Sequence, residues 1–167
     1  MNTDTLIARA RSGLGKKTVY SSPGVTPPLS ANTWPASGAK NDCSGYVAWC
    51  LRISRVVDNP KYKQINGGWF ETTAIHADMG GSWGIFDGLD TPVVGAFVCY
   101  PDKDGHDGHI GVITAVTGGK GVAAIQKVIH CSLGGWKNLG DAIQETAPAP
   151  WLARSDSLIG WYTGVTN

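Results

Sequence analysis

The residues best suited to covalent chemistry are one cysteine and two histidines that lie far apart in the sequence. Cys43 stands in "NDCSGYVAWC" directly after Asp42, a residue type that caps helix N-termini. The positive end of a helix dipole can lower the pKa of a thiol, whereas the neighbouring carboxylate opposes that effect. This segment alone leaves two interpretations open for Cys43: a nucleophile at a helix start or a small packed residue in a core.

The two histidines mark the ends of neighbouring apolar runs. His109 begins "HIGVITAV" and His130 ends "AIQKVIH". If these runs pair as a hairpin about the turn "GGKG", His109 faces about residue 128, and His130 becomes its diagonal neighbour. A base oriented by a second imidazole is an arrangement that activates a thiol. For each histidine alone, a hydrogen-bonded polar residue at a strand end is an equal alternative.

The elements expected to hold these residues are helices followed by antiparallel strands. Apolar spacing predicts helices over 3–14 and 43–54, and a shorter one over 71–79. A segment rich in Pro, Ser and Gly separates the first two helices and is expected to be a functional loop. β-branched runs predict strands over 93–100, 109–116, 121–131 and 158–163. This order predicts an α+β fold in a single domain spanning 1–167.

Composition excludes several classes of partner. Lys and Arg number 14 against 13 Asp and Glu, so the net charge of +1 does not favour nucleic acid. No apolar stretch approaches the roughly 20 residues of a membrane span, and the N-terminus lacks the pattern of a signal peptide. The four cysteines form no CxxC pair, which argues against a structural zinc site or a disulfide scaffold. We therefore expect no metal and no cofactor, and Cys50 and Cys99 are expected to be core residues.

Three motifs, taken together and in order, resemble the NlpC/P60 family of papain-like cysteine peptidases, which cut bacterial cell-wall peptides. They are DCSG at 42–45, GHIG at 108–111 and IH at 129–130. The resemblance covers about residues 5–132 and leaves 133–167 without assignment. It implies a papain-like fold, in which the nucleophile at a helix start packs on an antiparallel sheet.

By this resemblance Cys43 is the nucleophile, His109 the base and His130 the residue that orients it. The stretch "KTVYSSPG" is similar to the family's tyrosine motif upstream of the cysteine, so Tyr20 is expected to line the site. Asp42 and Ser44, which flank the cysteine, are expected to take part in substrate binding or in the oxyanion site.

The resemblance also implies a function. The substrate is the peptidoglycan stem peptide, cleaved between the γ-carboxyl of D-glutamate and a diamino acid, and no cofactor takes part. A chain without a signal peptide is expected to be made in the bacterial cytoplasm and to act as a monomer at the cell wall or periplasm. It would arrive there as a phage endolysin that needs a holin, or as a toxin paired with an immunity protein.

Three alternatives stay open at this stage. A CHAP-type amidase or endopeptidase shares the Cys–His pair but commonly uses a carboxylate or amide as the third residue, for which Gln126 is the nearest candidate. In a non-catalytic wall-binding module, aromatic residues would bind glycan and Cys43 would only be packed. A thiol acyltransferase could use the same fold. For Trp136, Trp151 and Trp161 we expect a place in the core rather than sugar stacking.

Overall fold

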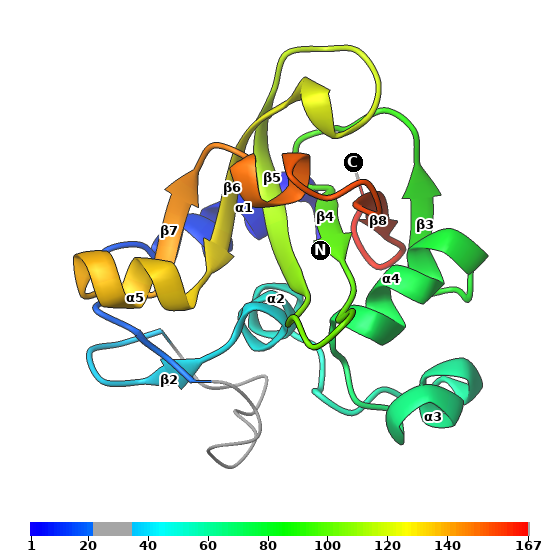
Figure 1. Ribbon diagram of the computed structural model, residues 1–167, viewed down its shortest axis with the longest axis horizontal. Helices are drawn as coiled ribbons and strands as arrows, with labels where there is room; N and C mark the ends of the chain where they lie inside the picture. The colour runs from blue at the N-terminus through cyan, green and yellow to red at the C-terminus, as the bar shows by residue number, and fades with distance from the viewer. Residues whose placement is uncertain (22–34, 167) are drawn as a thin grey trace.

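A six-stranded antiparallel sheet forms the centre of the part of the chain that the computed structural model describes, residues 1–21 and 35–166 (Figure 1). Residues 22–34 of the expected functional loop lie outside the described residues. The strands follow the spatial order β3-β8-β4-β5-β6-β7. Their bounds are β3 Phe86–Leu89, β4 Phe97–Tyr100, β5 His109–Val116, β6 Ile125–Cys131, β7 Ile143–Thr146 and β8 Leu158–Tyr162.

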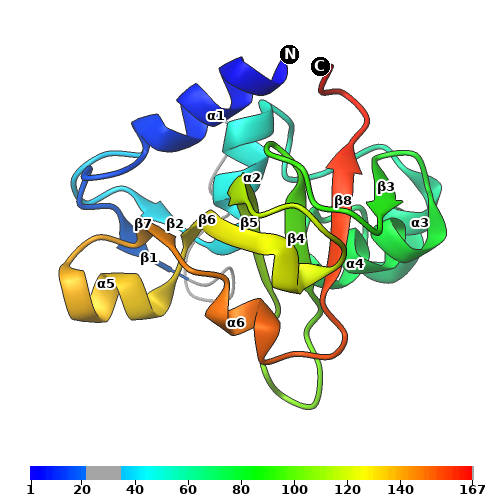
Figure 2. The same ribbon diagram turned by 90° about the horizontal axis from the view of Figure 1, so that it is seen from above.

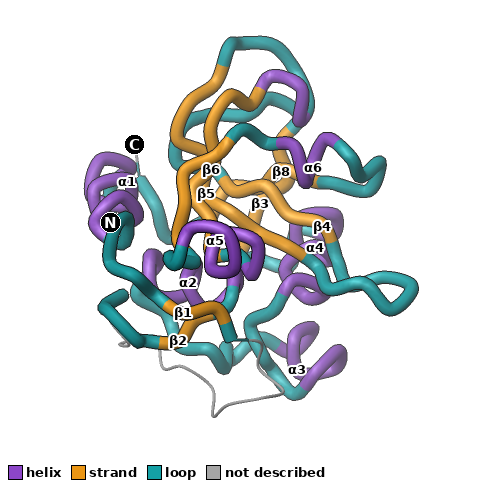
Figure 3. The backbone as a smooth tube through the Cα atoms, turned by 60° about the vertical axis from the view of Figure 1, so that its left-hand side comes forward, coloured by secondary structure: helices purple, strands orange, loops and turns teal. Residues whose placement is uncertain are grey.

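Helices cover both faces of this sheet. α1 (Thr3–Ser12), α2 (Cys43–Leu51) and α4 (Thr72–Gly81) share one apolar core with one face, and α3 (Pro60–Asn66) packs beside α4. α6 (Ala149–Leu152) lies across the opposite face, as Figure 2 shows. α5 (Leu133–Leu139) lies next to a small parallel pair, β1 (Val19–Tyr20) and β2 (Lys40–Asn41) (Figure 3). This arrangement confirms the predicted α+β class.

The helix that carries Cys43 is central and completely buried. Its cap is the Asp42 carboxylate, which accepts a hydrogen bond from the Gly45 amide at 2.6 Å. The helix ends at Leu51 because Arg52 adopts a left-handed conformation with φ of 58°, so the prediction that it extends to residue 54 was wrong. After this turn the chain doubles back and returns Arg55 to the helix start.

The predicted strands are confirmed at β5 and, in shorter form, at β4, β6 and β8. The predicted hairpin register was wrong, because Val128 pairs with Ile113 rather than with His109. The connection is longer than the Gly-rich turn, since residues 122–124 form a 3-10 turn before β6 begins. His130 instead lies across from Gly111, so it is still the diagonal neighbour of His109 on the same sheet face.

The two faces of β5 divide its residues between two cores. Ile110 and Val112 pack toward α2, whereas Ile113 packs with Val128 and Trp151 on the α6 side. Trp151 is fully buried, as expected, and so are Cys50 and Cys99. Within the two described ranges, no helix combines the length and the apolar character that a membrane crossing needs.

Candidate active site

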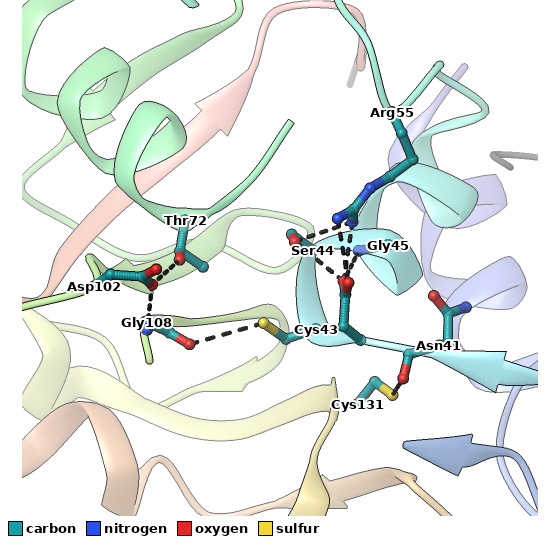
Figure 4. A network of polar contacts seen from close by, with 10 residues as sticks. Asn41, Cys43, Ser44, Gly45, Arg55, Thr72, Asp102, Gly108 and Cys131 are labelled. Carbon is teal, nitrogen blue, oxygen red and sulfur yellow. Dashed lines mark hydrogen bonds and ion pairs between the residues drawn. The ribbon is translucent and has the colours of Figure 1, made fainter. Parts of the chain in front are cut away.

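The Cys43 thiol lies against the backbone at the start of β5. Cys43 is the first residue of α2 and is only 6% exposed. Its Sγ donates a hydrogen bond to the Gly108 carbonyl at 3.9 Å (Figure 4), and the Ile110 amide lies near enough to affect its pKa. Gly108 and Ile110 are the two neighbours of His109 in the chain, so the thiol meets the strand at the predicted base.

Two side chains fix the position of Gly108. The Asp102 carboxylate accepts hydrogen bonds from the Gly108 amide and from the Thr72 hydroxyl, as Figure 4 shows. A Cβ on Gly108 would come within 2.3 Å of the Thr72 hydroxyl and 2.7 Å of the Asp102 carboxylate, so only glycine fits. Asp102 therefore holds the loop that presents both the Gly108 carbonyl and His109.

A buried ion pair supports the helix start from the other side. One Arg55 nitrogen donates to the Asp42 carboxylate and to the Ser44 hydroxyl, both at 3.0 Å, and the second donates to Asp42 at 3.2 Å. The Ser44 hydroxyl in turn donates to Asp42. The Arg55 guanidinium also lies 4.7 Å from the ring centroid of Trp69. A Cβ on Gly45 would lie 2.5 Å from the Asn41 amide oxygen and 3.0 Å from Arg55, which explains the glycine in this first turn.

The surroundings of Cys43 favour its protonated form. Burial, together with the negative charge of Asp42, raises the pKa of Cys43 to about 12. The amides of Ile110 and Ser44 and the charge of Arg55 act in the opposite direction without overcoming burial. The helix start therefore does not by itself produce a thiolate, and ionisation of Cys43 requires a base or a bound substrate.

The two histidines form a hydrogen-bonded pair across β5 and β6. The Nε2 atom of His109 lies 2.7 Å from Nδ1 of His130. Trp151 stacks on the His109 ring at 5.1 Å and meets the His130 ring edge-on at 5.2 Å. The Trp151 indole also donates to the His109 carbonyl at 3.4 Å. This packing fixes both rings, and Nδ1 of His109 is the ring nitrogen that makes no hydrogen bond among the described residues.

Both imidazoles are neutral at physiological pH. Burial, followed by the charge of His130, lowers the pKa of His109 to about 3, and burial lowers the pKa of His130 to about 4. A neutral imidazole is the form that can accept a proton. Thiol and imidazoles are thus uncharged in the resting site.

Two adjoining hollows give access to these groups. One is lined by Cys43, with Asp42 and Ser44, and the other by His109 and His130. Both are lined by Tyr20, Asp107 and Gly108, so they meet at the start of β5. The predicted residues Tyr20, Asp42, Cys43 and Ser44 therefore line the first hollow, and Tyr20, His109 and His130 line the second.

Sequence reasoning assigned no role at this site to Thr72, Asp102, Arg55 or Trp151, nor to Thr146, whose hydroxyl lies 2.9 Å from Nε2 of His130. Arg55 was placed away from the helix face, and Thr146 and Trp151 lie in the segment that received no assignment. A buried aspartate at a helix cap requires a cation, which could have indicated Arg55.

Gln126, the alternative partner for His109, is exposed toward the far end of β6, whereas His130 makes the hydrogen bond. Within the described ranges no cluster of His, Cys, Asp and Glu could hold a metal ion.

Comparison of the sequence with known protein families assigns the chain to one of them. The chain matches the CHAP domain over residues 32–127, more than half of its length. CHAP domains are cysteine amidase or peptidase domains of the papain-like class related to NlpC/P60, and they act on peptidoglycan. A search of curated proteins finds no match to the chain. Cys43 and His109 lie inside the matched segment, and His130 lies just beyond it.

Proposed function

Since the chain belongs to the CHAP domain family, we propose that it hydrolyses an amide bond of the peptidoglycan stem peptide with Cys43 as its nucleophile. The observation that carries this proposal is the 2.7 Å hydrogen bond between His109 and His130, on a strand whose preceding residue, Gly108, contacts the thiol of the helix-start Cys43. His109 acts as the base and His130 orients it. The family match supports peptidoglycan amidase or endopeptidase activity, and the residue roles are our inference from the geometry.

The first step is proton transfer from sulfur to nitrogen. The Cys43 thiol exchanges its hydrogen bond to Gly108 for one to Nδ1 of His109, the S–H bond breaks, and sulfur keeps the electron pair. The thiolate then attacks the amide carbonyl carbon. Because burial raises the pKa of the thiol and lowers that of His109, this transfer is unfavourable in the free protein. We infer that it occurs together with attack on a bound substrate.

The developing oxyanion requires hydrogen-bond donors at the start of α2. The first intrahelical bond of α2 runs from the Tyr46 amide to the Asp42 carbonyl, so the Cys43 amide precedes it and is the proposed donor. The His109 imidazolium then protonates the leaving amine, and water attacks the acyl-enzyme with His109 again as the base. Tyr20, which lines both hollows, is proposed to contact the substrate.

For the scissile bond we propose the amide between the γ-carboxyl of D-glutamate and a diamino acid. The resemblance to NlpC/P60 enzymes supports this choice, whereas CHAP membership is equally compatible with cleavage at another stem-peptide amide. Delivery as a phage endolysin or as an injected toxin stays a prediction.

The test is incubation of the protein with purified sacculi, followed by mass spectrometry of the released fragments. Cys43→Ala should lower the rate by about three orders of magnitude or more, because it removes the sulfur that forms the acyl-enzyme in the proposed mechanism. The fragments identify the bond: peptides that end in D-glutamate with a free γ-carboxyl support our proposal, and intact stem peptides freed from the glycan indicate an amidase.

The matched control is Cys50→Ala, the same substitution two turns later on the same helix. It removes a fully buried thiol outside both hollows and should keep activity once circular dichroism confirms folding. Full lysis by Cys43→Ala would refute the proposal, and so would release of fragments that carry no newly cleaved amide.

A further inference from the structure

A hydroxyl group ends the hydrogen-bond chain that begins at His109. Nε2 of His130 lies 2.9 Å from Oγ1 of Thr146, at the end of β7. The same hydroxyl donates to the Ala147 carbonyl at 2.9 Å. Thr146 lies outside the segment that matches the CHAP domain, on a strand next to the one that carries His130.

The direction of this chain follows from the single proton of the hydroxyl. A carbonyl oxygen can only accept, so the Thr146 proton points to Ala147 and the oxygen is left as an acceptor. His130 must then carry its proton on Nε2 and donate it to Thr146. A neutral imidazole with a proton on Nε2 has a lone pair on Nδ1, and that nitrogen accepts from Nε2 of His109.

The direction of this hydrogen-bond chain also determines which nitrogen of His109 can accept a proton from the thiol. With its proton on Nε2, neutral His109 has its lone pair on Nδ1, the nitrogen that makes no hydrogen bond within the described part of the chain. This is the tautomer that can take the proton of Cys43. The reverse direction would place a proton on Nδ1 of His109, and the ring could not act as a base toward the thiol.

We propose that Thr146 is a positioning residue that sets the tautomers of His130 and His109 and thereby prepares His109 to accept a proton. The same direction also suits the product of the transfer. The imidazolium of His109 keeps its Nε2–H donated to His130, and His130 keeps its own donated to Thr146, so no proton in the chain must move. Activity as a readout rests on the proposed function, whereas the tautomers are measurable without it.

The experiment compares Thr146→Val, which removes the acceptor at nearly constant shape, with Thr146→Ser, which keeps it. Nitrogen-15 NMR of the histidine rings should show both imidazoles protonated at Nε2 in the wild type and in Thr146→Ser. In Thr146→Val the His130 and His109 signals should shift toward a mixture of tautomers. On sacculi, kcat of Thr146→Val should fall by about three- to tenfold, the range expected for one lost hydrogen bond, with KM within about twofold.

Thr114→Val is the matched control. Thr114 lies on β5 and donates to Glu145 at 2.7 Å, one residue from Thr146, without contacting either histidine. It should leave the tautomers and kcat unchanged. Wild-type His109 protonated at Nδ1, or unchanged tautomers in Thr146→Val, would overturn the inference. If Cys43→Ala remained active while these NMR results held, the proposed function would fail and the tautomer assignment would stand.

Discussion

Removal of the Arg55 guanidinium should destabilise the start of α2, the helix that carries Cys43, more than any ordinary surface change. Arg55→Met keeps the apolar stem of the side chain but deletes three hydrogen bonds to Asp42 and Ser44. The side chains of Arg55 and Asp42 are only 5% and 9% exposed, so the abandoned carboxylate has little access to water. We expect the free energy of unfolding to fall by about 3–5 kcal/mol, as for other buried pairs that lose one partner.

The double variant isolates the cause. Asp42→Asn removes the charge and keeps an oxygen that can accept from the Gly45 amide at the helix cap. In Asp42→Asn/Arg55→Met no unpaired charge remains, so the combined loss should be smaller than the sum of the single losses by about 2 kcal/mol or more. Loss of Arg55 alone should also raise the pKa of Cys43 further, because its charge opposes that of Asp42.

Urea denaturation followed by tryptophan fluorescence measures these differences, with the slope m checked for constancy. Lys63→Met is the control: its partner Asp58 is 93% exposed, and the unfolding midpoint should match that of the wild type. A loss below about 1 kcal/mol for Arg55→Met would show that water or a rearrangement compensates Asp42, and the role assigned to Arg55 would be wrong.

Two further predictions concern the histidine pair. The folded-state pKa values of His109 and His130, about 3 and 4, lie below the ordinary value of 6.5, so the unfolded chain binds more protons in that interval. The contribution of the two histidines to the free energy of unfolding should therefore be fully present above about pH 6.5. It should fall by about 1.4 kcal/mol per pH unit for each histidine as the pH drops toward 4. Urea titrations at several pH values test this, and an equally steep fall in His130→Gln would contradict it. Gly111→Ala should cost about 1–3 kcal/mol and most of the activity, because its Cβ would lie 2.4 Å from Val128 and 3.1 Å from the Cβ of His130. Gly134→Ala, which meets nothing within 4 Å, is the control, and equal urea midpoints for the two variants would refute the packing argument.

The elements that sequence patterns identify best are those with a strong apolar period and a clear boundary. The helix at Cys43 and the strand at His109 are of this kind, and both begin at the predicted residue. The missed elements have weak local signals. The short helix α5 contains two glycines and depends on its Ser132 cap, and β7 has only four residues. Tertiary packing, rather than propensity, determines these elements.

The residues of the site likewise divide into those with a recognisable local sequence signal and those without one. Local motifs around Cys43, His109 and His130 resemble those of a known family, and this resemblance identified the three residues. The predicted register between β5 and β6 was wrong because the Gly-rich segment gave no sign of the 3-10 turn that lengthens the connection. The observed register differs from the predicted one by an even number of residues, so His130 stays on the same sheet face as His109 and remains its diagonal neighbour. Arg55, Thr146 and Trp151 carry no such motif, because each reaches the site only through a chain reversal or a segment distant in sequence.

The central position of β8 in the sheet also constrains how the protein folds during its synthesis. Residues 158–162 fill the gap between β3 and β4 and pair with both. Until a growing polypeptide has delivered this stretch from the ribosome, β3 and β4 each present an unpaired edge, and the sheet cannot close. A recombinant fragment cut to the 32–127 match would carry the same defect, so expression trials of this hydrolase should retain the strand through Tyr162.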